Sequence, residues 1–295
     1  MAVLLAGVAL AGACGLGSAP PPPRTSGPAA PSTLPPTTGP GTTAATTPVT
    51  TPVTPTTTPT TPSATTTPPP PPVTTPPPPP TGLPGRLLGT DWTQIPTGRP
   101  VVALTFDCGA SDAGAASILA TLAANHVPAT FFLTGQFAQR YPVTARRMAA
   151  GYRVGNHSMT HPHLTALTDA QVRAQVLDAA TAIRAVTGAD PAPWFRFPYG
   201  DRTAHTIAVV NALGYVPVRW TVDTLGWQGT SGGRSAASVL ARVLASAGPG
   251  EIVLMHVGAN PDDGTTLDAD ALPAVITRLR ARGYGFVTLD ALLTG

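Results

Sequence analysis

The stretch VALTFDCGAS, residues 102–111, decides the fold class, because a largely apolar run leads directly into an acid, a thiol and a glycine. A run of this kind is typical of a buried strand. Similar runs recur, and we predict strands at 100–107, 129–135, 152–157, 194–198, 215–223, 251–258 and 284–289. Amphipathic stretches between them predict helices at 113–125, 137–150, 169–186, 204–213, 236–247 and 269–282. This alternation predicts an α/β fold with a parallel sheet, either a barrel or an open sheet.

Polar residues recur where these predicted strands end. They are Asp107, Cys108, His157, His161, Arg196, Asp223 and His256. In parallel α/β folds the carboxyl ends of the strands form the active site. Each residue alone has an ordinary explanation, such as a helix cap, a turn or a core cysteine. Their joint occurrence favours a catalytic site.

The part of the chain before this pattern has a different composition. The 295 residues include 37 prolines, most of which lie with threonines between Pro20 and Pro84. No charged residue occurs between Arg24 and Arg86, so we expect a disordered linker over 19–86 and a folded domain over 87–295. The net charge of +3 comes without a basic stripe, which argues against a nucleic-acid-binding protein.

The first residues, MAVLLAGVALAGACGLGS, predict an export signal over 1–18, because the apolar run is too short to span a bilayer. Cleavage could follow the small residues 11–13, or a lipid could be attached at Cys14, where LAGAC resembles a lipoprotein signal. We favour the lipid anchor, and we expect no other contact with the membrane. Either outcome leaves Cys108 without a disulfide partner in an exported, cell-surface protein.

Five short motifs resemble those of the polysaccharide deacetylases, the NodB-homology or carbohydrate esterase family 4 enzymes. They are TFDCG at 105–109, HSMTH at 157–161, RFPYG at 196–200, VDTLGW at 222–227 and LMH at 254–256. Their order and spacing are those of the family, and the likeness extends over about 100–293. The resemblance implies a distorted, incomplete (β/α) barrel. It also implies metal-dependent removal of acetyl groups from polymers of N-acetylated sugars, or less often from acetylated xylan.

The resemblance assigns a role to each polar residue of the motifs. His157 and His161 would bind one divalent ion, zinc or else cobalt, and Asp107 would be the catalytic base. Arg196 would orient Asp107 and keep it ionised, and His256 would be the general acid.

Four further residues would contact the substrate. The backbone N–H of Tyr199, in a turn set by Pro198, would stabilise the oxyanion. Trp227 and Leu254 would form the apolar wall that receives the acetyl methyl group.

Two positions depart from the family pattern. Cys108 stands where the family has an aspartate that binds the metal, and Gly226 stands where it has an aspartate before the tryptophan. The Cys108 thiolate could replace the first carboxylate as a ligand. Alternatively Cys108 only packs, and the two histidines, water and Asp112 hold a weaker metal. Asp223 could partly replace the second carboxylate, and we include it among the residues at the substrate.

Two function classes follow from these observations. The first is a monomeric, active deacetylase acting on cell-wall glycan, which we prefer because the base, both histidines, the arginine and the acid are all present. Its substrate would be peptidoglycan at N-acetylglucosamine or N-acetylmuramic acid, with chitin oligomers and acetyl-xylan as alternatives. The second is a wall-binding protein that keeps the groove but has lost turnover.

Overall fold

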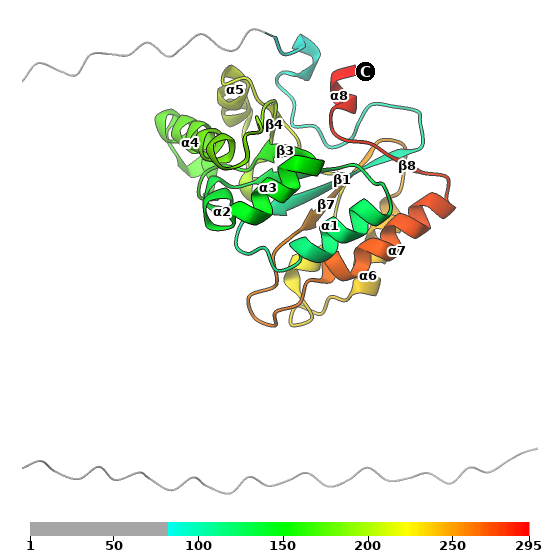
Figure 1. Cartoon of the computed structure of the whole chain (residues 1–295). Helices are drawn as coiled ribbons and strands as arrows, with labels where there is room; N and C mark the ends of the chain where they lie inside the picture. Colours follow the sequence, from blue (N-terminus) through cyan, green and yellow to red (C-terminus); the bar gives the residue numbers. More distant parts are fainter. Residues whose placement is uncertain (1–81, 295) are drawn as a thin grey trace, which may run out of the picture. The chain divides into compact units, whose positions relative to one another are not determined.

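The computed structural model describes residues 82–294 (Figure 1). The predicted export signal, Cys14 and the linker up to residue 81 lie outside the described residues. The first element is a short 3-10 helix, η1 (Gly85–Leu87), and its Leu87 side chain is buried close to the predicted domain start. Within residues 82–294, no helix is both long and apolar enough to cross a membrane.

The core of the domain is a curled, parallel sheet that forms an incomplete barrel, as predicted. Its strands follow the order β5-β4-β3-β2-β1-β7-β6, and β8 pairs with β1. They are β1 (Val101–Cys108), β2 (Ala129–Leu133), β3 (Arg153–Asn156), β4 (Trp194–Phe195), β5 (Val216–Pro217), β6 (Val222–Asp223), β7 (Glu251–His256) and β8 (Gly285–Phe286).

Helices surround this sheet in the order expected for repeated strand–helix units (Figure 1). They are α1 (Ala115–Ala124), α2 (Gly135–Arg140), α3 (Pro142–Gly151), α4 (Asp169–Thr187), α5 (Ala204–Ala212), α6 (Ala236–Ser246), α7 (Leu267–Ala281) and α8 (Ala291–Thr294). Three more 3-10 helices are η2 (Leu164–Ala166), η3 (Pro198–Gly200) and η4 (Gly226–Gln228). The six predicted helices are therefore present, with one divided in two.

Two elements differ from the prediction. The strand expected over 215–223 is split into β5 and β6, which lie at opposite edges of the sheet. The chain crosses the open side of the barrel between β5 and β6. The two halves of this apolar run therefore pair with strands at opposite edges of the sheet. The helix expected over 137–150 is divided at Tyr141 because Pro142 starts a new helix at its first position.

The two faces of β1 have different environments because side chains alternate along a strand. Leu104, Phe106 and Cys108 pack in the main hydrophobic cluster with α1 and α7. Ala103 belongs to a second cluster inside the barrel. Asp107 has the same parity as Ala103, so it faces the barrel interior, near the carboxyl end of the sheet.

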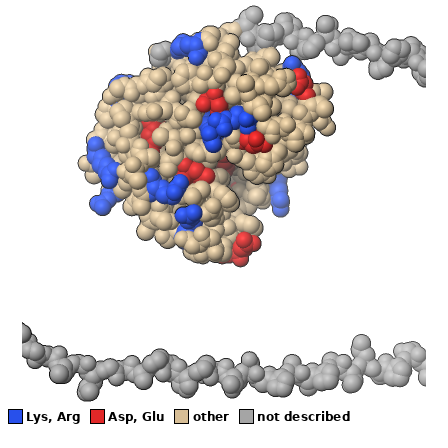
Figure 2. Space-filling view, turned by 180° about the vertical axis from the view of Figure 1, so that it is seen from behind, with Lys and Arg blue, Asp and Glu red and all other residues tan. Residues whose placement is uncertain are grey.

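The opposite end of the barrel is closed by the two ends of the described chain. Leu87 of η1 and Leu292 of α8 are both buried in the interior cluster. Arg86 donates hydrogen bonds to the carbonyls of Leu292 and Leu293, and these segments lie together in Figure 1. Figure 2 shows small basic and acidic groups, several of them adjacent to each other, on a mostly uncharged surface. The other end of the barrel, where the strands have their carboxyl ends and Asp107 lies, is the candidate position of a site.

Candidate active site

The sheet register brings two predicted catalytic residues next to each other. Asp107 at the end of β1 is paired directly with His256 at the end of β7. Because paired residues of neighbouring strands point to the same face, both side chains enter the barrel interior. Asp107 is buried, and the His256 side chain is 26% exposed. An acid and an imidazole thus lie side by side where substrate can reach the imidazole.

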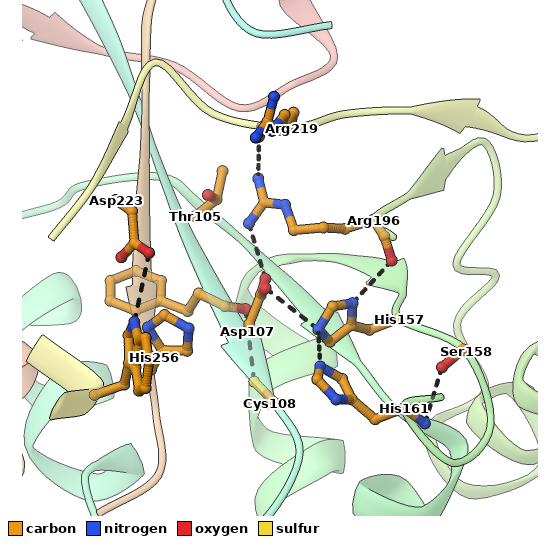
Figure 3. Close-up of polar contacts among 12 residues, drawn as sticks. Thr105, Asp107, Cys108, His157, Ser158, His161, Arg196, Arg219, Asp223 and His256 are labelled. Atoms are coloured by element: carbon orange, nitrogen blue, oxygen red, sulfur yellow. Dashed lines mark hydrogen bonds and ion pairs between the residues drawn. The ribbon is translucent and has the colours of Figure 1, made fainter. Parts of the chain in front are cut away.

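Arg196, which follows β4, holds Asp107 in place (Figure 3). Its Nη1 donates to Asp107 Oδ1 at 2.8 Å, while its Nε and Nη2 donate to the carbonyls of Val218 and Arg219. The guanidinium also lies 4.1 Å from the centroid of the Phe132 ring. Arg196 is fully buried, so its partners replace the water that would otherwise solvate its donors.

His157 and His161 form the expected pair on the other side of Asp107 (Figure 3). Their Nε2 atoms are 3.1 Å apart, and His157 Nε2 is 3.3 Å from Asp107 Oδ2. His157 Nδ1 lies 2.8 Å from the carbonyl oxygen of Arg196. A carbonyl only accepts hydrogen bonds, so Nδ1 carries the proton and Nε2 keeps its lone pair.

The charges in this cluster suit metal binding and base catalysis. Burial lowers the pKa of His157 despite Asp107, and burial with the His157 charge lowers the pKa of His161 to about 4. Both imidazoles are therefore neutral near pH 7, as ligation requires. Burial opposes ionisation of Asp107, but His157, Arg196 and His256 outweigh it and lower its pKa. Asp107 is thus a carboxylate.

The two imidazoles fit a zinc-like ion. Nitrogens bound at about 2.0–2.1 Å in a tetrahedral site lie roughly 3.4 Å apart, close to the observed 3.1 Å between His157 and His161. No group of three or more His, Cys, Asp or Glu side chains within 82–294 could hold an ion. Within the described residues, His157 and His161 are therefore the two side chains that could bind an ion, and water and substrate would have to complete its coordination.

The structure places Cys108 apart from this pair. Its side chain is fully buried in the main hydrophobic cluster, and its Sγ lies 3.7 Å from the carbonyl oxygen of Phe106 (Figure 3). Burial, followed by the charge of Asp107, raises the pKa of the thiol well above its usual value. This placement disagrees with the ligand prediction and agrees with the packing alternative. Asp112 accepts a hydrogen bond from Thr144 instead.

Tyr199 and Pro198 lie in η3, next to the histidine pair. Tyr199 has a left-handed backbone with φ of 59°, and its ring contacts His161 edge-on and stacks on His163. The two turn hydrogen bonds of η3 start from the N–H groups of residues 200 and 201. The N–H of Tyr199 takes no part in them, which suits the oxyanion role predicted for it.

Trp227 and Leu254 lie near His256, as the predicted apolar wall requires. Trp227 is 47% exposed, and the centroid of its ring is 6.4 Å from that of His256. Leu254 points into the interior two residues before His256. Asp223 accepts hydrogen bonds from the Leu225 N–H and from Trp227 Nε1. Asp223 therefore positions the tryptophan.

Asp268 is a site residue that the sequence prediction missed. Its Oδ2 accepts a hydrogen bond from the His256 N–H at 2.8 Å. Asp268 precedes the helix predicted over 269–282, where an acid is an ordinary helix-start residue. The one signal in the sequence is Gly226, because it stands where the family has an aspartate and so indicates that another residue could supply the carboxylate. Asp268, and not Asp223, lies against that glycine.

Comparisons with known proteins give consistent results. A family model described as polysaccharide deacetylase matches residues 94–218. The chitooligosaccharide deacetylase of Sinorhizobium fredii is 37% identical over 196 residues, covering 64% of this chain and 89% of that protein. The crystal structure of a peptidoglycan N-acetylglucosamine deacetylase, Bc1960, is 31% identical with a TM-score of 0.62, covering 68% of this chain and 91% of that one. A carbohydrate esterase family 4 pseudoenzyme from Bacillus anthracis is 30% identical with a TM-score of 0.60, covering 66% of each chain.

Proposed function

The chain belongs to the polysaccharide deacetylase family, and from this premise we propose that it hydrolyses N-acetyl groups on a cell-wall glycan. The observation that carries the proposal is the arrangement of Asp107 between His256 on one side and the His157–His161 pair on the other. The substrate would be peptidoglycan, at N-acetylglucosamine or N-acetylmuramic acid. Relatives named for chitooligosaccharide and for peptidoglycan both support an N-acetylglucosamine polymer.

We propose one divalent ion, zinc or cobalt, at His157 and His161. A bound ion would polarise the acetyl carbonyl and make a water molecule more acidic. The protein supplies two neutral imidazoles, and the Arg196 carbonyl fixes the tautomer of His157 that leaves its Nε2 lone pair free.

The proton transfers are divided between Asp107 and His256. Asp107 is held ionised by Arg196 and can accept the proton of the attacking water. Burial opposes protonation of His256, but Asp268, Asp107 and Asp223 outweigh it and raise its pKa above 6.5. A protonated His256 can donate to the nitrogen of the departing amine. Neighbouring groups thus separate the two pKa values in the directions that a base and an acid need.

The remaining residues bind the acetyl group. The N–H of Tyr199 can donate to the oxyanion, while Leu254 and Trp227 provide an apolar surface for the methyl group. Leu254 forms the buried end of this apolar surface, close to Asp107 and His256. Trp227 forms its exposed end. An exposed aromatic ring is a suitable contact for the apolar face of a sugar.

We further propose that the protein acts at the cell surface, exported and held by a lipid on Cys14. Incorporation of labelled palmitate by wild type and not by Cys14→Ala would support the anchor. Equal labelling of the two proteins would leave simple secretion as the better explanation.

Acetate release from chitin oligomers and purified peptidoglycan, with and without added zinc or cobalt, tests the activity. We expect release that depends on the ion and is lost in His161→Ala. His205→Ala is the matched control, because His205 is an exposed histidine on α5 that pairs with Asp169, away from the proposed site.

A glycan-binding protein without turnover is the second candidate. The position of Cys108 in the core, where the family has a ligand, is the observation that favours it, and a pseudoenzyme is among the similar structures. Binding to peptidoglycan without acetate release under any of the ion conditions would select this function.

A further inference from the structure

Gly226 and Asp268 occupy complementary space beside His256. Gly226 is buried in η4, and Asp268 is the second residue of α7, with 2% of its surface exposed. A Cβ atom added at Gly226 would lie 2.4 Å from Asp268 Oδ1 and 2.6 Å from its Cγ. Atoms cannot approach so closely, so the carboxylate fills the space that a side chain at 226 would take.

The Asp268 carboxylate is directed at His256. Its Oδ2 accepts the His256 N–H at 2.8 Å and lies 3.5 Å from His256 Nδ1. Among residues 82–294, neither Asp268 Oδ1 nor His256 Nδ1 has a hydrogen-bond partner. Asp268 is the acidic residue that lies within 4 Å of the His256 ring nitrogen in this part of the chain. A buried aspartate at the first turn of α7 is also stabilised by the helix dipole.

Other charged groups face His256 from the elements packed around it. Asp107 comes from β1 and Asp223 from β6, and their charges act on the imidazole less strongly than that of Asp268. Asp107 is already paired with Arg196, and Asp223 is bonded to Trp227. Asp268 is the carboxylate left to pair with His256.

We propose that Asp268 is the positioning residue of His256, and that it replaces from α7 the carboxylate that position 226 does not provide. The inference rests on the proposed function only in taking His256 as the acid. It explains how the chain can carry glycine at 226 and still keep a charged partner beside the imidazole.

Asp268→Asn tests the proposal, because asparagine can still accept the His256 N–H but carries no charge. Titration of the His256 ring proton by NMR should give a lower pKa than in wild type. In the acetate assay, kcat should fall on the order of tenfold at alkaline pH, less than the roughly 10²–10⁴ that loss of the general acid itself would cost, with KM little changed. Asp270→Asn is the control, since it removes a charge from an exposed position on the same turn.

A residue exchange provides the second arm. Gly226→Asp alone should destabilise the protein, because its Cβ and its charge would meet Asp268. Gly226→Asp combined with Asp268→Ala should relieve that loss and restore the raised pKa of His256. An unchanged His256 titration and pH profile in Asp268→Asn would overturn the inference. A shifted titration in a protein that releases no acetate would instead reject the proposed function and keep the positioning role.

Discussion

Replacement of Cys108 separates a packing role from a metal-binding role. The side chain is fully buried, and the carbonyl of Phe106 is its hydrogen-bond partner. Cys108→Ala removes a methylene-sized group, worth about 0.8 kcal/mol, and leaves a small cavity, so we expect a loss of about 1–2 kcal/mol in unfolding free energy. Zinc affinity should not change, because Sγ faces the helices and not the histidine pair.

Cys108→Asp should be far more harmful, although aspartate is usual in the family. A carboxyl group placed in this apolar cluster without a donor costs roughly 2–7 kcal/mol. For a domain of this size each kcal/mol corresponds to about 2–4 °C in Tm, so we expect a fall of roughly 4–28 °C, against roughly 2–8 °C for alanine. Cys108→Ser is the matched control, since its hydroxyl keeps the volume and can donate to the Phe106 carbonyl.

Thermal unfolding and zinc titration of the three variants decide between the roles. Loss of zinc binding in Cys108→Ala, together with a stable Cys108→Asp that binds zinc, would refute the packing argument. It would mean that the end of β1 turns the thiol towards the barrel interior when the ion binds.

Further predictions concern the ion and the pH dependence of stability. His157→Ala and His161→Ala should each lose most of the bound zinc measured by atomic absorption, and full metal content in both would contradict the assignment. Asp107→Asn should keep the zinc and lose acetate release by 10²-fold or more; unchanged turnover would point to another base. Burial raises the pKa of Glu251 to about 7 despite a hydrogen bond from Ser246. The folded state then holds a proton that the unfolded state releases near 4.5, so stability should fall by up to about 3 kcal/mol as pH rises from 4.5 through 7. Glu251→Gln should remove this dependence in urea unfolding at pH 5 and 8, and a slope equal to that of wild type would reject it.

Most of the fold could be predicted from local patterns. Apolar runs located β1, β2, β3 and β7 almost to the residue, because each is buried on both faces. The apolar run at 215–223 predicts one strand, and this prediction is wrong because nothing local shows that the two halves pair with different edges of the sheet. Pro142 did carry the signal for the divided helix, as proline favours the first position of a new one.

Part of the site could also be predicted from local patterns, because several of its residues lie where predicted strands end. Each of four residues lies at the carboxyl end of a strand or directly after it, so the topology brings them together; they are Asp107, His157, Arg196 and His256. The direction of Cys108 was also available, because its side chain must alternate with that of Asp107. Asp268 could not be found, since its contact with His256 depends on how α7 packs against β7.

The three bonds of Arg196 have a consequence for how inactive relatives can arise. This one guanidinium holds the catalytic carboxylate and also binds the segment that crosses the open side of the barrel. Activity could be lost by substitution at Asp107 or His161 with the architecture intact. Substitution of Arg196 would remove the donor from two buried acceptors and one partly buried acceptor and would loosen the crossing segment. Selection for folding alone should therefore preserve this arginine in lineages where selection for turnover has ended, and its presence by itself is poor evidence that a relative is active.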